Sequence, residues 1–110
     1  MSSSENFLNY VLENLESLYS SVKYRKMFGQ YCLYIENKAI CFICDDQLFI
    51  KFTQSGQHYL DQNAISLTKD YIFKGSKLHF LASDIIENHD ILHNLINQSL
   101  KDIKVIKRKK

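Results

Sequence analysis

The sequence predicts an α+β fold, a two-layer sandwich in which a mainly antiparallel sheet carries helices on one face. Residues 24–52 contain three short apolar runs rich in aromatic and β-branched residues, separated by the turn-favouring pairs Glu36-Asn37 and Asp45-Asp46. This pattern is typical of consecutive β-hairpins. Amphipathic helical patterns flank the strands, so the expected order is helix, three or four strands, short helix, two strands and long helix.

The composition is that of one soluble domain. The chain of 110 residues, 45% hydrophobic and 24% charged, is long enough for a single core. No apolar run approaches the length of a membrane span, and the first residues lack the basic start and apolar stretch of a signal peptide. An odd count of three cysteines favours free thiols in a reducing compartment. We therefore expect a cytoplasmic protein.

The charge is unevenly distributed along the chain. Residues 101–110 hold six basic residues and one acidic residue, whereas the rest holds eight basic and eleven acidic residues. We expect one domain over residues 1–103 and a basic tail over residues 104–110. The candidate nucleic-acid contacts of this tail are Lys104, Lys107, Arg108, Lys109 and Lys110. The alternative is a solvated end that aids solubility, which the acidic body favours.

The first element is an amphipathic helix over residues 4–20. Ser2 and Glu5 have capping-box spacing at its start, and Ser20-Ser21 ends it. Apolar residues at helical spacing predict its buried side: Phe7, Leu8, Val11, Leu12, Leu15, Leu18 and Tyr19.

The strands of residues 24–52 follow, and two-residue turns would place Cys32 opposite Cys41 and Phe42 opposite Phe49. Because side chains alternate across a strand, these pairings define two faces. The uncharged face is expected under the helices: Cys32, Tyr34, Ala39, Cys41, Ile43, Leu48, Ile50 and Phe52. The other face is assigned outward because an unpaired buried lysine is costly. It carries Tyr31, Leu33, Ile35, Lys38, Ile40, Phe42, Cys44, Gln47, Phe49 and Lys51.

This second face is unusually apolar for a solvated surface, which is typical of a contact surface. Its candidate interaction residues are Leu33, Ile40, Phe42 and Phe49, in a homodimer or with another partner. The alternative is that a helix of the same chain covers this face.

The remaining elements are a short helix through Asp61, a loop over residues 61–70 and a hairpin. The hairpin joins residues 71–73 to residues 78–81. A final helix from about Asn88, preceded by the capping-box spacing of Asp84 and Glu87, would bury Leu92, Leu95, Ile96, Leu100 and Ile103.

The cysteines and histidines could bind a metal or react, but each has a simpler structural interpretation. Cys41 and Cys44 lie three apart in one strand and would point to opposite faces, and no further ligands complete a metal site. Cys32 opposite Cys41 is better placed for a disulfide, but a reducing compartment disfavours one. His89 and His93 are four apart near a helix start, where solvent exposure is the simpler interpretation. We expect no enzyme, cofactor or small-molecule substrate.

One stretch resembles a known family. Arg25-Lys26-Met27-Phe28-Gly29, then Leu33-Tyr34, the turn at Glu36-Asn37 and Asp45-Asp46-Gln47-Leu48-Phe49-Ile50-Lys51 are similar to the TfoX N-terminal domain family. The similarity continues through Tyr71, Phe73 and Gly75 and covers roughly residues 7 to 103.

The resemblance implies a two-layer domain with an antiparallel sheet and no established catalytic residues. The family includes the Sxy/TfoX regulators of natural competence, which implies a role in transcriptional regulation with a regulator protein as partner. Cys32 stands where the family often has glycine, and the chain stops where the regulators continue into a helical domain.

Arg25 and Lys26 lie beside the Met27-Phe28-Gly29 motif of this resemblance. They are expected either to present a cationic patch or to form a structural corner, with Met27 and Phe28 in the core and Arg25 paired to a carboxylate. A second hypothesis is a small nucleic-acid-binding module that uses these two residues and the tail.

Overall fold

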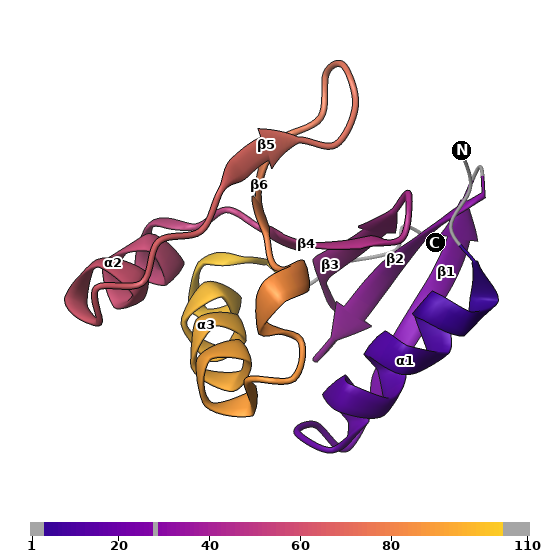
Figure 1. Ribbon diagram of the computed structural model, residues 1–110, viewed down its shortest axis with the longest axis horizontal. Helices are drawn as coiled ribbons and strands as arrows, with labels where there is room; N and C mark the ends of the chain where they lie inside the picture. The colour runs from indigo at the N-terminus through magenta and orange to yellow at the C-terminus, as the bar shows by residue number, and fades with distance from the viewer. Residues whose placement is uncertain (1–3, 28, 105–110) are drawn as a thin grey trace.

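The computed structural model describes residues 4–27 and 29–104, where six strands form one antiparallel sheet in the order β1-β2-β3-β4-β6-β5 (Figure 1). The elements in chain order are α1 (Glu5–Glu16), β1 (Val22–Met27), β2 (Gln30–Ile35), β3 (Lys38–Cys44), β4 (Gln47–Lys51), α2 (Gln54–Gln62), β5 (Lys69–Tyr71), β6 (Leu78–Leu81), the 3-10 helix η1 (Ser83–Ile85) and α3 (His89–Asp102). The predicted α+β class and element order are confirmed. No helix of the described ranges is long and apolar enough to cross a membrane.

The two turns of the meander are as predicted. Glu36 and Asn37 have φ of 55° and 63°, and Asp45 and Asp46 have φ of 53° and 55°. Positive φ at both central residues is the geometry of a type I′ turn, whose twist matches that of the flanking strands. The β3–β4 register that follows, with Phe42 opposite Phe49, is also confirmed.

The pairing of β2 with β3 departs from the prediction. Tyr34 pairs with Ala39 as expected, but the register then shifts, so that Leu33 pairs with Cys41 and Cys32 with Phe42. Ile40 is the extra residue of this β-bulge. Because a slip of one residue moves every side chain to the other face, the predicted faces of β2 are reversed.

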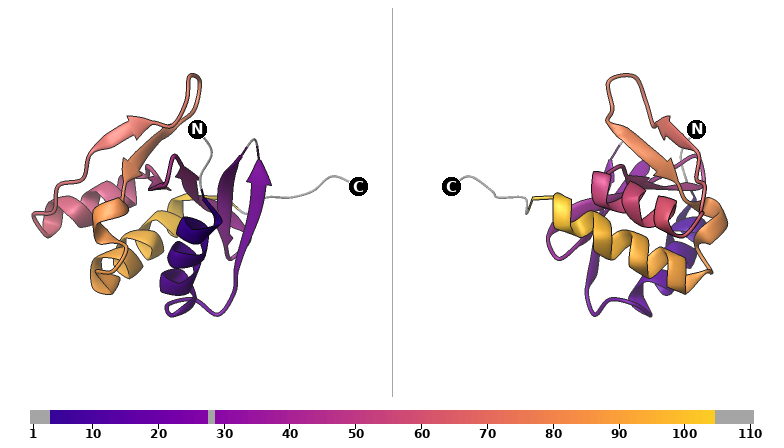
Figure 2. Two further views of the ribbon diagram at one scale, coloured as in Figure 1. Left: turned by 45° about the vertical axis from the view of Figure 1, so that its right-hand side comes forward. Right: turned by 90° about the vertical axis from the view of Figure 1, so that its left-hand side faces the viewer.

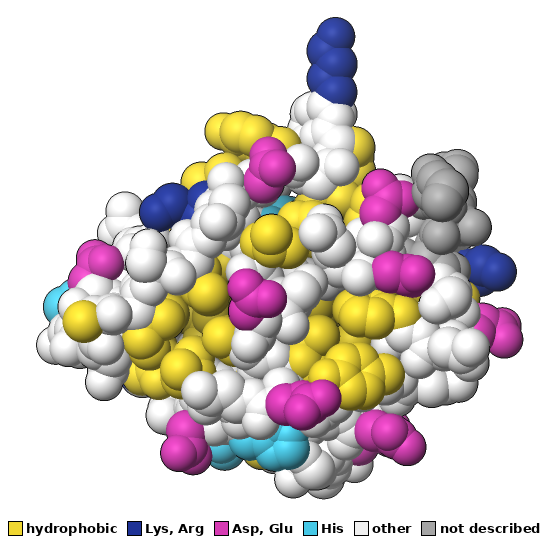
Figure 3. All heavy atoms as spheres, viewed as in Figure 1, with side chains coloured by type: hydrophobic (Ala, Val, Ile, Leu, Met, Phe, Trp, Pro, Cys, Tyr) yellow, Lys and Arg dark blue, Asp and Glu magenta, His cyan; other side chains and the backbone are white. Residues whose placement is uncertain are grey.

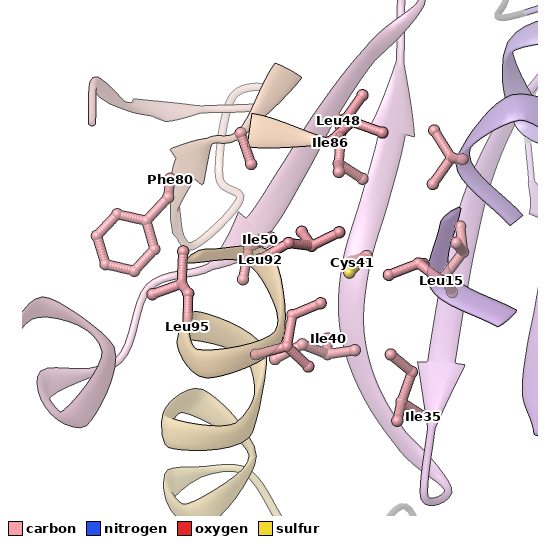
Figure 4. Packing of buried hydrophobic residues seen from close by; sticks show 14 of the residues in the cluster. Leu15, Ile35, Ile40, Cys41, Leu48, Ile50, Phe80, Ile86, Leu92 and Leu95 are labelled. Atoms are coloured by element: carbon pink, nitrogen blue, oxygen red, sulfur yellow. The ribbon is translucent and has the colours of Figure 1, made fainter. Parts of the chain in front are cut away.

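The core therefore contains residues that the sequence placed outside. Leu33 and Ile40 are only 0% and 1% exposed. The side chains shown in Figure 4 join α1, α3 and the covered face of the sheet around Cys41. The buried strand residues of this face are Tyr31, Leu33, Ile35, Ile40, Cys41, Ile43, Leu48, Ile50 and Phe80.

Each helix begins at a hydrogen-bonding cap. Ser4 Oγ accepts from the Phe7 amide at 3.1 Å, whereas the predicted cap Ser2 lies outside the described residues. Thr53 caps α2 by accepting from the Gly56 amide at 3.0 Å. The cap of α3 is Asn88, whose side chain accepts from the Ile91 amide, and the helix therefore begins where it was predicted. The segment after Ala82, where a capping box was expected, forms η1 instead.

The hairpin of β5 and β6 begins earlier than predicted, at Lys69 rather than Tyr71. It projects beyond the rest of the sheet (Figure 2). Helix α2 lies beside α3. Phe80 of β6 is fully buried, and its ring lies 5.3 Å from that of Phe52 between centroids.

Lys38 lies on the helix-covered side and makes a contact that the sequence did not predict. Its Nζ donates to the Leu100 carbonyl oxygen, at the C-terminal end of α3, at 2.8 Å. This carbonyl also accepts from the Ile103 amide, so the cation adds a second, charge-assisted hydrogen bond and interacts favourably with the helix dipole. The assumption that this lysine must face outward is wrong because the side chain is paired.

Substituting Lys38→Met should lower the free energy of unfolding by about 1–2 kcal/mol, because a charge-assisted hydrogen bond and a dipole interaction are both lost. Urea denaturation of the two proteins measures the difference. Lys101→Met is the control, because Lys101 is exposed and bonds to Gln98 within the same helix. Equal costs for the two substitutions would contradict a structural role for Lys38.

Candidate functional site

The face of the sheet opposite α1 and α3, hereafter the outer face, is the candidate site. By strand register it carries mainly apolar and basic side chains, with two glutamines, from β1–β4 and β6. They are Lys23, Arg25, Met27, Gln30, Cys32, Tyr34, Ala39, Phe42, Cys44, Gln47, Phe49, Lys51, His79 and Leu81. None of these residues carries a carboxylate, but Asp70 of β5, which pairs with His79, places one at the edge of this face.

The helix-covered side has the opposite charge character. Exposed acidic residues lie along both helices, among them Glu13 and Glu16 on α1 and Asp90 on α3. Figure 3, viewed with α1 in front of β1, shows acidic side chains scattered over this side. Acidic residues are thus common on the helices. The basic strand residues are divided between the outer face, with Lys23, Arg25 and Lys51, and the covered side, with Lys26 and Lys38.

A pocket lies where the loop of residues 72–77, at the tip of the β5–β6 hairpin, meets the outer face. The Phe73 ring packs on Phe42 with centroids 6.4 Å apart, and His79 lies at the same distance on another side of Phe42. The pocket has a volume of about 320 Å³. Its lining comprises Cys32, Ala39, Ile40, Cys41, Phe42, Lys51, Ile72, Phe73, Gly75, Ser76, Lys77 and His79.

The loop that closes the pocket is held in shape by Ser76. Its Oγ accepts from the Ile72 amide at 3.0 Å and from the Phe73 amide at 3.4 Å, and donates to the Lys77 carbonyl at 3.1 Å. The preceding Gly75 has a φ of 89°, a backbone conformation that favours glycine. The wall formed by this loop is therefore an ordered part of the fold.

The titratable groups of the pocket are partly desolvated. The pKa of Lys51 is lowered by burial and by the nearby charge of Lys77. Burial also lowers the pKa of His79, whose Nδ1 lies 2.7 Å from the Lys77 carbonyl oxygen. The neutral ring donates from Nδ1 to this carbonyl, which leaves Nε2 as an acceptor.

The thiols are poorly suited to nucleophilic chemistry. Burial raises the pKa of Cys32, although a hydrogen bond with Tyr34 and the charges of Lys51 and Arg25 partly offset this. Burial likewise raises the pKa of Cys41. Because the thiolate is the reactive form, a raised pKa disfavours reaction at neutral pH.

The predicted interaction residues divide into two groups. Phe42 and Phe49 lie on the outer face as expected, but only Phe42 is partly exposed there, whereas Phe49 is 7% exposed. Leu33 and Ile40 lie in the core, because the bulge reverses the face of Leu33 and turns the extra residue Ile40 inward, so their assignment to an outer contact surface is wrong.

The predicted basic candidates are also divided. Arg25 pairs with Cys32 and Lys26 with Tyr31, so these neighbours point to opposite faces of β1 and do not form one patch. Lys104 is exposed and lines a hollow of about 550 Å³ together with Lys51 and Lys77. The tail candidates Lys107, Arg108, Lys109 and Lys110 lie outside the described residues, as does Phe28 of the expected structural corner.

The cysteines are buried free thiols. Cys41 faces the core and Cys44 the outer face, as predicted, but the bulge means that Cys32 is not opposite Cys41. Among the described residues, no three His, Cys, Asp or Glu side chains are grouped to hold a metal ion.

The histidines of α3 are half-buried rather than solvent-exposed as predicted. His89 Nε2 lies 2.8 Å from Asn14 Oδ1, and the His93 ring packs edge-on against Tyr19 at 5.2 Å. His89 therefore joins α3 to α1, and His93 joins α3 to the turn that follows α1.

Sequence reasoning missed the pocket residues Lys51, Lys77 and His79. Lys51 lies two residues after Phe49 in β4, and side-chain alternation therefore placed both on the outer face. Its role in a pocket was not predicted. The contact of residues 72–77 with that face had no local signal, because it joins the loop to Phe42 of β3, which is distant in the sequence.

Comparison with known proteins gives two matches. The family model of the TfoX N-terminal domain matches residues 13–103. The chain is also 28% identical over 75 residues to the uncharacterized 12.7 kDa protein in trpE 5'region of Spirochaeta aurantia. This match covers 68% of the chain and spans 62% of that relative's length.

Proposed function

Because the chain belongs to the TfoX N-terminal domain family, we propose that it is a non-enzymatic, cytoplasmic interaction domain that contributes to transcriptional regulation linked to DNA-uptake competence. It acts by binding a protein partner through the outer face. The family membership supports the regulatory role, and the character of the outer face supports the mode of binding.

The observation that carries this proposal is the combination of aromatic and basic side chains on one face of the sheet. Phe42 is partly exposed there, and Phe73 on the adjoining loop is 54% exposed. Aromatic residues together with arginine are enriched at interaction surfaces, and Arg25 lies on the same face. A helix-free apolar face of this kind is where a partner would bury most area.

The charges on this face indicate which kind of partner fits. Lys23, Arg25 and Lys51 project from it without a carboxylate on the same strands. Two copies joined face to face would bring like charges together, which costs free energy. An acidic protein segment with apolar side chains is complementary, so we infer such a partner rather than a homodimer through this face.

A rhodamine-labelled peptide of alternating acidic and apolar residues tests the proposal by fluorescence anisotropy across a salt series. We expect salt-sensitive binding that is weakened at least tenfold by Lys51→Glu and little changed by Lys101→Glu. The two substitutions change the net charge equally, but Lys101 lies on α3. Equal weakening would mean that net charge alone drives binding and would contradict a specific surface.

Light scattering at increasing protein concentration tests the homodimer. The charge argument predicts a monomer at physiological salt. A stable dimer that Phe42→Asp dissociates would show that the outer face binds a second copy instead.

A nucleic-acid-binding module is the second candidate, and one observation favours it. Lys51, Lys77 and Lys104 line the same hollow, which brings the first residue of the basic tail beside the cations of the sheet. Phosphates bound there would release counterions, so the affinity would fall steeply with salt. Anisotropy with a short DNA duplex, on the full chain and on a chain ending at Ile103, tests this candidate. It requires tight binding that the truncation abolishes.

A further inference from the structure

The pocket under the loop of residues 72–77 has the dimensions of a small-molecule site. Its volume of about 320 Å³ lies at the lower end of the range of such sites, roughly 300–1,000 Å³. Ala39 and Phe42 form its floor on β3, and Ile72 and Phe73 form a wall on the loop. An apolar group of about the size of one aromatic ring could be enclosed between these side chains.

The polar part of the pocket is cationic. Lys51 and Lys77 both contribute to its lining, whereas no carboxylate of the described residues does. Over residues 4–27 and 29–104 neither lysine has an ion-pair partner, although Lys51 is only partly exposed. Two neighbouring ammonium groups in a partly desolvated site repel each other, and burial together with the charge of Lys77 lowers the pKa of Lys51. An anion between them would remove this repulsion.

The apolar and cationic parts are held in a fixed relation. Lys51 lies directly opposite His79 in the β4–β6 ladder, and the His79 ring packs on Phe42. Lys77 is brought to the same place by the loop, whose hydrogen bonds to Ser76 fix its path. The pocket is therefore preorganised for a ligand that combines the two characters.

We propose that this pocket binds a small organic anion in which a carboxylate is joined to an apolar group of about ring size. The carboxylate lies between the ammonium groups of Lys51 and Lys77, and the apolar group packs on Phe42, Ile72 and Phe73. This ligand site does not depend on the proposed protein partner, because every residue that it uses belongs to this chain.

Titration of the ¹⁵N-labelled full chain with 3-phenylpropionate, followed by ¹H–¹⁵N correlation spectra, tests the site. We expect saturable shifts confined to the lining of the pocket, with a dissociation constant on the order of millimolar for so small a ligand. The uncharged 3-phenylpropanamide has nearly the same shape and should bind at least tenfold more weakly.

Three matched variants separate the pocket from general electrostatic attraction. Lys51→Met and Lys77→Met should each weaken 3-phenylpropionate binding at least fivefold. Lys74→Met removes a cation of the same loop that does not line the pocket, and it should leave binding unchanged. The dispersion of each spectrum shows whether the variant is folded.

Phe73→Ala tests the apolar contact, since this exposed side chain can be shortened without opening the core. It should weaken both ligands alike. Equal affinity for acid and amide, equal effects of the three lysine substitutions, or shifts located elsewhere would overturn the proposal.

Discussion

Substituting Leu33→Ala should lower the free energy of unfolding by about 2–5 kcal/mol, the usual cost of a fully buried leucine. Leu33 is 0% exposed and points under the helices because the bulge at Ile40 shifts the β2–β3 register. Its removal leaves a cavity that the surrounding side chains cannot fill. Equilibrium denaturation in urea, monitored by circular dichroism, measures the change.

Phe42→Ala is the matched control for this prediction. Without the bulge, Leu33 and Phe42 would share one face and both substitutions would act on one surface. With the bulge they lie on opposite faces. Because Phe42 is partly exposed, Phe42→Ala should lower the free energy of unfolding markedly less than Leu33→Ala does. A Leu33→Ala variant as stable as the parent would contradict the observed register.

Substituting Gly56→Val should destabilise the protein by about 3 kcal/mol, because the first turn of α2 packs tightly on α3. A Cβ at Gly56 would lie 2.7 Å from Ser99 Oγ and 2.8 Å from Thr53 Oγ1. These two hydroxyl groups bond to each other at 3.0 Å, and Thr53 caps the helix. A side chain at Gly56 would therefore disrupt both the cap and the helix contact. Thermal unfolding measures the loss.

Two further variants identify the cause of that loss. Gln54→Val places the same side chain in the same turn on the exposed side and should cost less than about 1 kcal/mol. The smaller change Gly56→Ala should be partly rescued when Ser99→Ala removes the nearest atom. No rescue in the double variant would mean that crowding against Ser99 Oγ is not the cause of the loss.

The fold was predictable to the extent that its signals are local. The two-residue turns at Glu36-Asn37 and Asp45-Asp46 depend on residues that tolerate positive φ, and both are present as predicted. The helices follow from apolar spacing and were displaced only at their ends. The α1 helix ends at Glu16 rather than near Ser20.

The bulge had no comparable signal. Ile40 fits a regular strand as well as it fits a bulge, and only the packing of the whole sheet on α1 and α3 selects the shifted register. Lys38 also favoured the wrong assignment of the faces, because an unpaired lysine was expected to face outward. Its hydrogen bond to the carbonyl at the end of α3 joins distant segments and could not be predicted. Half of the proposed contact surface was consequently assigned to the wrong face.

The site was predictable only in part for the same reason. Phe42 and Phe49 were placed correctly because the β3–β4 hairpin is regular. The pocket needs Lys51 from β4, Lys77 from the loop and His79 from β6, which are brought together by the course of the β5–β6 hairpin. No spacing within one segment encodes that arrangement.

The central claim, that the outer face is the binding surface, is tested most directly by mapping the bound acidic-apolar peptide on the ¹⁵N-labelled chain. We predict shifts of amide signals in β2, β3, β4 and β6 and in residues 72–77, which diminish as salt is raised. Shifts located on α1 and α3, or no shifts at millimolar peptide and low salt, would contradict the claim.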